Sequence, residues 1–256
     1  MKRHRAFAML LCAAALASCG ESAVQEITGP LASARVRFFN FGVGAPGVHF
    51  YANNTKMTAI NSATGVESTT GTVYGSVGSG GFYSAIAPGS YELSGKIAAT
   101  TDKDLAISKV TSTIADGKKY SFYMSGIYNT AAKTVEGFVV EDPFSETIDF
   151  SATQVRFVNA ISNSQPLTLY ARNPTTGAEV AVGGPVAYKS AGAFTSMPGA
   201  VYDLSARYTG SATNVISRAA VSFSAGKVYS VNARGDITVT SSTAANRPFL
   251  DVTANR

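Results

Sequence analysis

The sequence VRFFN at residues 36–40 returns as VRFVN at residues 155–159, and the rest of the chain is arranged around these two copies. In each copy, β-branched and aromatic side chains alternate with polar ones, and arginine lies on the polar side. This alternation is typical of a half-buried β-strand, so we expect the arginine to face away from the core. Each copy opens a series of matching sequence marks about one domain in length. The repetition therefore predicts one folding unit that occurs twice.

The matching marks keep the same order in both copies. The first marks are a glycine-rich bend (74–78 and 188–192) and a Pro-Gly turn that leads into a strand with tyrosine (88–94 and 198–205). They are followed by an Ile-Ser strand (107–109 and 216–218) and a Gly-x-x-Tyr-Ser strand (117–121 and 226–230). Residues 142–144 and 247–249 read as a further pair of equivalent marks. Short strands, Gly/Pro turns and the absence of a helical period predict an all-β chain of two tandem antiparallel β-sandwich domains.

The composition and the repeat together predict five segments. Apolar residues make up 45% of the 256 residues, which is enough for a buried core, and 24 glycines fit a fold rich in turns. We expect a lipoprotein signal peptide (1–18), a tether (19–33), a first sandwich (34–144), a linker (145–152) and a second sandwich (153–256).

The first residues have the three parts of a secretory signal. A basic start is followed by an apolar run at residues 6–17 that is too short to span a membrane, and then by small residues. The run ends in LASCG at residues 16–20, which resembles the lipobox of bacterial lipoproteins and implies cleavage before Cys19 and acylation of its thiol. Gly20 in place of aspartate implies passage to the outer membrane. We therefore expect an exported protein, lipid-anchored to the bacterial envelope.

The cysteine count and the charge exclude two other classes. Cys12 lies inside the leader, so the mature chain holds one thiol and cannot form an intrachain disulfide. Removal of the leader takes away Lys2, Arg3 and Arg5, leaving 18 basic against 16 acidic side chains. This near balance, without a basic stripe, argues against a nucleic-acid partner.

Three of these marks resemble a known family. The Val-Arg-Phe-x-Asn strand, the Pro-Gly-x-Tyr strand and the Gly-x-x-Tyr-Ser strand look like domain-of-unknown-function family 4397, whose members occur as tandem copies in secreted and lipid-anchored bacterial proteins. The resemblance implies an immunoglobulin-like or related sandwich and an envelope location, but no activity. His49 and Thr168 stand where the family pattern has an acidic residue.

Several short patterns suggest chemistry, and each has a simpler interpretation. The glycines at residues 42–47 match the spacing of a dinucleotide-binding loop, but no helix follows, so we expect a turn between strands. Ser76 and Ser79 lack the flanking pattern of a nucleophile elbow. His49, the one histidine of the mature chain, is expected on an exposed strand face without a catalytic partner.

The acidic residues do not form a convincing site either. Asp102 and Asp104 could contact calcium, but their spacing is not that of a dedicated calcium loop. The acidic side chains between the two copies are expected to be a solvated face, with a role in holding the domains as the alternative: Glu141, Asp142, Glu146 and Asp149. We therefore predict a protein that is not an enzyme and holds no metal and no cofactor.

The aromatic residues remain as candidates for binding. Tyr51 and Tyr170 recur at matched positions beside inward-facing neighbours, so they should point outward, where tyrosines bind glycans or protein partners or cover a sheet. The prediction is a non-catalytic interaction or structural module whose partner is an envelope protein or matrix polymer. A small-ligand or glycan-binding module is the alternative. An envelope hydrolase that uses Asp104 or Asp203 is the third and least favoured hypothesis, because no carboxylate pair can be placed in one cleft from sequence.

Overall fold

The computed structural model describes residues 32–58 and 66–256, which belong to one compact unit. The predictions for the signal peptide, Cys19 and most of the tether lie outside the described residues. The described residues hold eighteen β-strands and one short 3-10 turn, η2 (Gly78–Gly81), and no α-helix. The all-β prediction is therefore confirmed. Among the described residues there is also no helix with the length and apolarity needed to cross a membrane.

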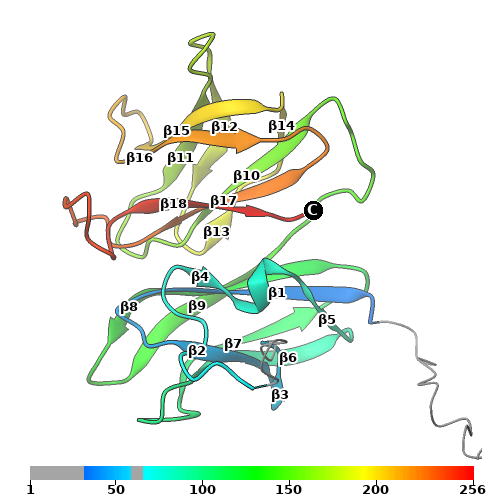
Figure 1. The fold of residues 1–256 in the computed structure, drawn as a ribbon, viewed down its shortest axis with the longest axis vertical. Helices are drawn as coiled ribbons and strands as arrows, with labels where there is room; N and C mark the ends of the chain where they lie inside the picture. Colours follow the sequence, from blue (N-terminus) through cyan, green and yellow to red (C-terminus); the bar gives the residue numbers. More distant parts are fainter. Residues whose placement is uncertain (1–31, 59–65) are drawn as a thin grey trace, which may run out of the picture. The chain divides into compact units, whose positions relative to one another are not determined.

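The first sandwich consists of two sheets (Figure 1). One sheet has the strand order β4-β1-β8-β9, with β5 also paired to β1, and the other has the order β3-β2-β6-β7. The strands of the first sheet are β1 (Ala34–Val43), β4 (Ser76–Val77), β5 (Ser84–Ile86), β8 (Lys119–Asn129) and β9 (Thr134–Glu141). Those of the second are β2 (Val48–Ala52), β3 (Thr55–Lys56), β6 (Gly89–Ile97) and β7 (Ala106–Ile114).

The second sandwich has the same strand order. Its sheets run β13-β10-β17-β18, with β14 paired to β10, and β12-β11-β15-β16. The first of these contains β10 (Thr153–Asn159), β13 (Ser190–Ala191), β14 (Thr195–Met197), β17 (Val228–Arg234) and β18 (Phe249–Ala254). The second contains β11 (Leu167–Arg172), β12 (Glu179–Val186), β15 (Ala200–Tyr208) and β16 (Ile216–Phe223). Position by position, β1 therefore corresponds to β10, β8 to β17 and β9 to β18.

The direction of one strand pair in each sandwich differs from the prediction. β1 runs parallel to β8, and β10 runs parallel to β17, whereas the other strand pairs of the described sheets are antiparallel. A parallel pair cannot be joined by a hairpin, because the chain must cross over to begin the second strand at the same end. The crossover here is the whole second sheet of the sandwich. The sheets are therefore mixed rather than purely antiparallel, and the finer likeness to immunoglobulin domains remains a prediction.

Each sandwich has its own aromatic or aliphatic core. In the first, Phe38 packs against Phe50 and Phe122 of neighbouring strands, with ring centroids 5.2 and 6.1 Å apart. The second fills the same space with smaller side chains around Phe157 and Phe223. Burial of a large apolar side chain contributes roughly 1.5–3 kcal/mol, so these clusters account for much of the stability of each sandwich.

The asparagine that ends each Val-Arg-Phe-x-Asn sequence holds the turn to the second sheet. Asn40 Nδ2 donates to Thr72 O at 2.8 Å, and its Oδ1 accepts from Gly42 N at 3.2 Å. Asn159 does the same with Val186 O at 3.1 Å and Ile161 N at 3.0 Å. The glycine-rich residues 42–47 therefore form a connection between β1 and β2, as predicted, and not a nucleotide loop.

Candidate functional site

Both arginines of the repeated strands are buried. The exposed fraction is 0% for Arg37 and 1% for Arg156, so the prediction that they face away from the core into solvent is wrong. The reason is that β1 and β10 are covered on both faces. One face packs on the second sheet of its own sandwich, and the other belongs to a cluster shared by the two sandwiches, which includes Phe39, Phe41 and Val158. A strand covered on both faces has no side that faces water.

Each arginine reaches the last strand of the other sandwich. Arg37 Nη1 donates to Ala254 O at 2.9 Å, at the end of β18. Arg156 Nη1 donates to Glu141 O at 2.8 Å, at the end of β9. These carbonyls are equivalent, because Glu141 pairs with the second residue of β8 and Ala254 with the second residue of β17. The two contacts form a reciprocal clamp between the sandwiches.

The next residue of each last strand completes the clamp. Arg156 Nη2 pairs with Asp142 Oδ1, and Arg37 Nη2 donates to Asn255 Oδ1. The backbone N–H of Asp142 and of Asn255 bonds to the neighbouring strand at 2.7 Å in each case, which confirms that the two positions correspond. The counterpart of Asp142 is therefore Asn255, so the predicted equivalence of residues 142–144 and 247–249 is wrong. The expectation of a solvated Asp142 is also wrong, since it is 2% exposed.

Hydroxyl groups close the clamp into a ring of hydrogen bonds. Tyr83 Oη donates to Asp142 Oδ2 at 2.6 Å and accepts from Arg37 at 3.2 Å. Ser230 Oγ accepts from Arg156 Nε at 3.0 Å and from Asn255 Nδ2 at 2.9 Å. The ring consists of six side chains: Arg37, Tyr83, Asp142, Arg156, Ser230 and Asn255. We call it the polar ring.

The polar ring carries an excess positive charge. It holds two guanidinium groups and one carboxylate, and Arg37 Nε has no hydrogen-bond partner. Aromatic rings cover both cations: Arg37 Cζ lies 4.4 Å from the Tyr83 centroid, and Arg156 Cζ lies 4.8 Å from that of Phe194. Burial, and then the nearby Asp142 carboxylate, raise the pKa of Tyr83 well above its usual range. Tyr83 therefore stays a neutral hydrogen-bond donor.

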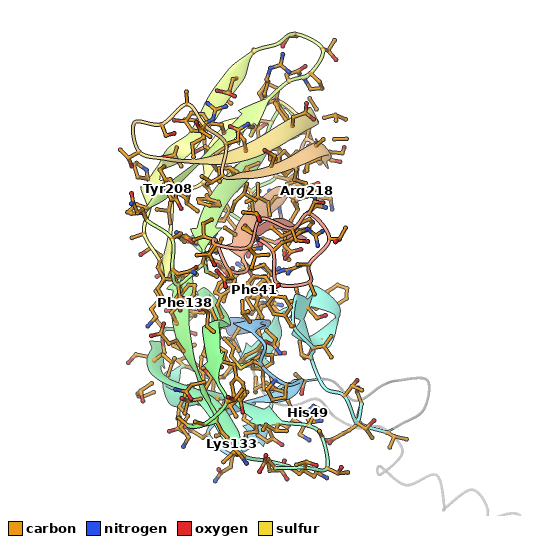
Figure 2. All side chains as sticks on the ribbon, turned by 90° about the vertical axis from the view of Figure 1, so that its left-hand side faces the viewer. Phe41, His49, Lys133, Phe138, Tyr208 and Arg218 are labelled. Atoms are coloured by element: carbon orange, nitrogen blue, oxygen red, sulfur yellow. The ribbon has the colours of Figure 1, made fainter. Side chains whose placement is uncertain are left out.

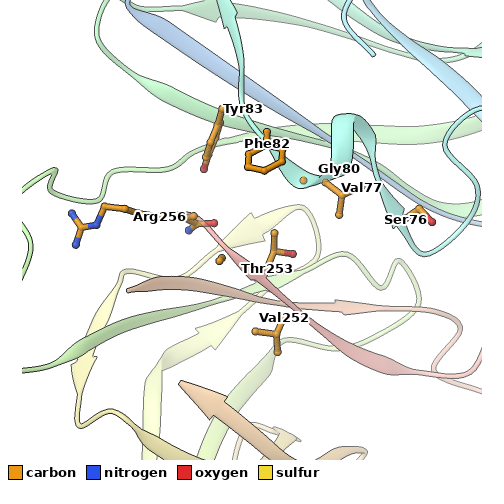
Figure 3. A pocket seen from close by; sticks show the side chains of 11 residues that line it. Ser76, Val77, Gly80, Phe82, Tyr83, Val252, Thr253 and Arg256 are labelled. Atoms are coloured by element: carbon orange, nitrogen blue, oxygen red, sulfur yellow. The ribbon is translucent and has the colours of Figure 1, made fainter. Parts of the chain in front are cut away.

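Two grooves open at the two ends of this shared interface. One, of about 440 Å³, lies between β13 and the end of β9, and the other, of about 680 Å³, lies between the η2 turn and β18. Figure 3 shows the larger groove, with Phe82 and Tyr83 on one wall and Val252 and Thr253 of β18 on the other. The two grooves occupy equivalent positions, because β4 corresponds to β13 and β9 to β18.

The larger groove differs from the smaller one by the η2 turn. Between β4 and β5 the chain has six residues, whereas three connect β13 to β14. The extra residues adopt left-handed backbone angles, with φ of 52° at Ser79 and 65° at Gly80. A non-glycine residue in this region carries a conformational cost, and such strain is common at functional sites. The turn holds Phe82 with 78% of its surface exposed at the rim of the groove.

The comparisons place these sandwiches in a family. The family model named domain of unknown function (DUF4397) matches residues 34–170, which is more than half of the chain. The chain belongs to this family. The match covers the first sandwich and extends through β10 into β11. No curated protein matches the sequence.

One solved structure resembles the DUF4397 chain only distantly. It is a leucine-rich repeat protein from Bacteroides thetaiotaomicron VPI-5482, with 11% identity and a TM-score of 0.22. The alignment covers 79% of this chain but 26% of the other, so the chain spans about a quarter of that protein's length. A likeness this weak supports no inference about fold or function.

Tyr51 and Tyr170, the predicted binding residues, are half-buried under cations. Lys96 Nζ lies 4.3 Å from the Tyr51 centroid, and Arg207 Cζ lies 4.4 Å from that of Tyr170. These cations project from the adjacent strands β6 and β15, so the two sandwiches repeat the arrangement. A cation over a ring attracts its negatively charged face and occupies it. Each tyrosine therefore covers its sheet together with a cation.

His49 is buried rather than exposed. It retains 7% of its surface because Thr58, Lys56 and Glu67 lie over it. Thr58 Oγ1 lies 3.5 Å from Nδ1, and Glu67 Oε2 lies 3.8 Å from Nε2. Burial, followed by the charge of Lys56, lowers the pKa of His49 below its usual value, which keeps the ring neutral.

The acidic residues singled out in the sequence are separated in the structure. Asp104 is an exposed residue before β7 in the first sandwich, and Asp203 accepts from Ala220 N at 3.0 Å in the second. Asp102 forms an ion pair with Lys133 at 2.6 Å. Within residues 32–58 and 66–256, no group of three or more His, Cys, Asp or Glu side chains could hold a metal ion. The absence of catalysis, metals and cofactors remains a prediction.

The polar ring is the feature that the sequence interpretation missed. A signal was present, because in both copies the arginine lies between two apolar neighbours, a valine before it and a phenylalanine after it. A merely solvated position would not need the same cation in both copies. Only the tertiary structure shows that the other sandwich covers the second face of β1 and of β10.

Proposed function

We propose that this chain is an exported, lipid-anchored protein of the bacterial cell envelope that acts by non-covalent contact and not by catalysis. Its two sandwiches are tandem copies of one DUF4397 module, which the identical strand order and the reciprocal clamp support. The lipobox-like residues 16–20 supply the anchor at Cys19, and the acyl chains would hold the protein at the outer membrane.

The observation that carries the interaction role is the asymmetry between the two interface grooves. The groove with the η2 turn presents Phe82, a large apolar side chain at 78% exposure, where its counterpart has no such residue. A strained turn that exposes an aromatic side chain contributes nothing to the core, so a contact with a partner explains it best. The partner we propose is another envelope protein.

Two experiments test these parts separately. Replacement of Cys19 by Ser should abolish labelling by a palmitate analogue and move the protein from the detergent to the aqueous phase on Triton X-114 partitioning. A photo-crosslinking residue at Phe82 should give a discrete protein adduct in intact cells. The same residue at Val180, which is 46% exposed on β12, is the matched control. Equal adducts at both positions, or none at either, would contradict the proposed contact site.

A second candidate function is the binding of a small ligand or glycan. It is favoured by a groove of about 780 Å³ in the second sandwich, which Tyr208, Phe249 and several hydroxyl-bearing side chains line. Pockets of this size with a few placed polar groups are typical of ligand sites. A thermal-shift screen with neutral and acidic oligosaccharides tests it, and no shift with any of them would contradict it.

A further inference from the structure

The second sandwich carries a long loop that the first lacks. Residues 235–248 connect β17 to β18, whereas residues 130–133 connect the equivalent strands β8 and β9. Loops longer than about 12 residues without secondary structure of their own are uncommon and are often functional. The loop forms one wall of the groove of about 780 Å³, through residues such as Thr240, Ser241 and Ser242.

The loop is ordered by its own hydrogen bonds. Asp236 Oδ1 accepts from Thr238 N at 3.0 Å and from Asn163 Nδ2 at 2.8 Å. The backbone N–H of Asp236 also donates to Asn246 O at 2.9 Å, which closes the base of the loop. The Asp236 carboxylate is therefore engaged by the loop itself and by Asn163 of the connection between β10 and β11. A wall that is already ordered loses little conformational entropy when a ligand binds.

Unpaired guanidinium groups gather beside this groove. The Cζ atoms of Arg218, Arg234 and Arg247 lie 5.3, 5.2 and 5.1 Å from the centroid of Phe249. Arg234 pairs with Asp251. In the described residues Arg218 and Arg247 form no ion pair. Each donates to one backbone carbonyl, Leu250 O at 2.7 Å and Ala244 O at 3.1 Å respectively, so most of their N–H groups remain available.

A second, smaller groove continues the first. Its volume is about 270 Å³, and Ser217 lines both grooves. It adds the guanidinium groups of Arg172 and Arg207, of which Arg207 is held by Glu179 through two 2.7 Å hydrogen bonds. We call the two grooves together the arginine face. Figure 2 shows Tyr208 and Arg218, which come from the neighbouring strands β15 and β16 that form this region.

The charge of the second sandwich agrees with an anionic ligand. Residues 153–256 hold nine basic and four acidic side chains, a net charge of +5, whereas residues 34–144 hold nine basic and eight acidic ones. The near balance of the whole mature chain therefore conceals a basic second sandwich. Such asymmetry raises the local concentration of anions at one part of the surface.

We propose that the arginine face binds a segment of an acidic polysaccharide, with Arg218 and Arg247 recognising a carboxylate group of a sugar ring. Guanidinium groups bind carboxylates through paired hydrogen bonds, and the serine and threonine hydroxyls of the loop match the hydroxyls of a sugar. Tyr208, over which no cation is placed within the described residues, offers apolar surface for the ring itself. Two guanidinium groups without an ion pair suit a ligand held through one or two carboxylates, whereas a nucleic-acid duplex is held by roughly 6–10 phosphate contacts. This proposal names the ligand class for the second candidate function, and it rests on the proposed non-catalytic role of the protein.

The test uses the full chain in detergent micelles and an oligogalacturonate as the probe. Binding should be measurable by calorimetry at low salt and weaken at least tenfold when sodium chloride rises from 50 to 300 mM. The Arg247→Gln variant should bind about tenfold more weakly, and the Arg218→Gln/Arg247→Gln variant more weakly still. Lys103→Gln removes the same charge from an exposed position of the first sandwich and should bind like the wild type. Thermal unfolding of each variant checks that the fold is retained.

Other outcomes overturn the proposal. Equal binding of the methyl-esterified, neutral oligomer would exclude recognition of the carboxylate. Equal binding of single-stranded DNA would show a general polyanion surface and not a sugar site. If the oligogalacturonate does not bind at all, the arginine face is not a site for acidic sugar. The palmitate and crosslinking experiments are independent of this result, so they show separately whether the anchored interaction role holds.

Discussion

The hydroxyl of Tyr123 donates a 2.8 Å hydrogen bond to Oδ1 of Asn232, its own counterpart in the other sandwich. The two residues correspond because Tyr123 pairs with Phe39 across β1 and Asn232 pairs with Val158 across β10. Equivalent residues meet only at a two-fold axis, so the interface of this single chain has the self-complementary form of a symmetric dimer. The arginine clamp lies around the same axis and repeats on both sides of it.

Removal of that hydroxyl should weaken the interface. Tyr123 is fully buried and stacks on Phe39 and Phe138, with centroids 4.4 and 4.9 Å away, and burial raises its pKa to about 12. Tyr123→Phe keeps this stacking but leaves a buried amide oxygen without a donor, which should lower the free energy of unfolding by about 1–3 kcal/mol. A double-mutant cycle with Asn232→Ala, measured by urea unfolding, should give a coupling energy of about 0.5–1.5 kcal/mol. A coupling near zero would contradict the bond.

The excess charge of the polar ring predicts that a second carboxylate stabilises the protein. Asn255→Asp places a carboxylate beside Arg37, just as Asp142 lies beside Arg156. Ser230 can then donate to the new carboxylate, as Ser121 donates to Asp142 at 2.7 Å. The free energy of unfolding should rise by about 1–3 kcal/mol at neutral pH. The gain should vanish in acid, because it requires the ionised form.

The opposite change should destabilise the protein. Asp142→Asn leaves two buried guanidinium groups without a carboxylate, and the loss of one partner of a buried pair costs about 3–5 kcal/mol. Asn129→Asp, at the exposed last residue of β8, is the control for Asn255→Asp because it changes the net charge by the same amount. The ring's charge balance would be refuted if both asparagine-to-aspartate variants shifted the urea midpoint equally.

His49 should make stability depend on pH. Its pKa is lowered in the folded state by burial and then by Lys56, while Glu67 and Asp104 oppose this and Lys103 adds to it. The unfolded chain therefore binds more protons below about pH 6.5, so stability is full above that pH and falls as the pH drops toward the lowered pKa. His49→Thr, which copies Thr168 of the second sandwich, should remove this slope. Urea unfolding between pH 5 and 7.5 measures how the free energy of unfolding changes with pH. An unchanged slope in the variant would show that groups other than His49 cause the pH dependence.

The contact between β7 and β9 requires a glycine. A Cβ built on Gly137 would lie 2.7 Å from Ser108 Oγ and 3.0 Å from Phe122 Cε2, although its backbone angles are ordinary. Gly137→Ala should therefore lower the free energy of unfolding by about 1–3 kcal/mol through overpacking. Gly184→Ala on β12 has nothing within 4 Å and should change stability little. Equal effects of the two substitutions would show that the contacts with Ser108 and Phe122 do not restrict position 137 to glycine.

Much of the fold follows from local residue pattern. The Gly/Pro turns and alternating strands predict the all-β class, and the repeated Val-Arg-Phe-x-Asn strand marks the first strand of each sandwich. The parallel pairing of β1 with β8 could not be read from the pattern, since it depends on how the chain crosses between sheets and not on any residue in either strand.

The site was predicted less well, and for a related reason. Tyr51 and Tyr170 were correctly identified as equivalent, but the cations over them come from strands β6 and β15, more than thirty residues away in sequence. Asp142 is predicted to be solvated because it belongs to a cluster of acidic residues between the two copies. Its burial depends on Arg156, which only the association of the sandwiches brings to it, and on Tyr83, which comes from the distant segment between β4 and β5.

The sequence by itself determined that this chain repeats a strand-forming unit, because strand periodicity and turn residues act over a few neighbours along the chain. Only the tertiary structure decided what the repeated arginine does. Alternation tells which residues share a face of a strand, but not whether water or another sheet covers that face. Here another sheet covers it, and a cation without water must find its hydrogen bonds in the protein, so Arg37 and Arg156 join the two halves.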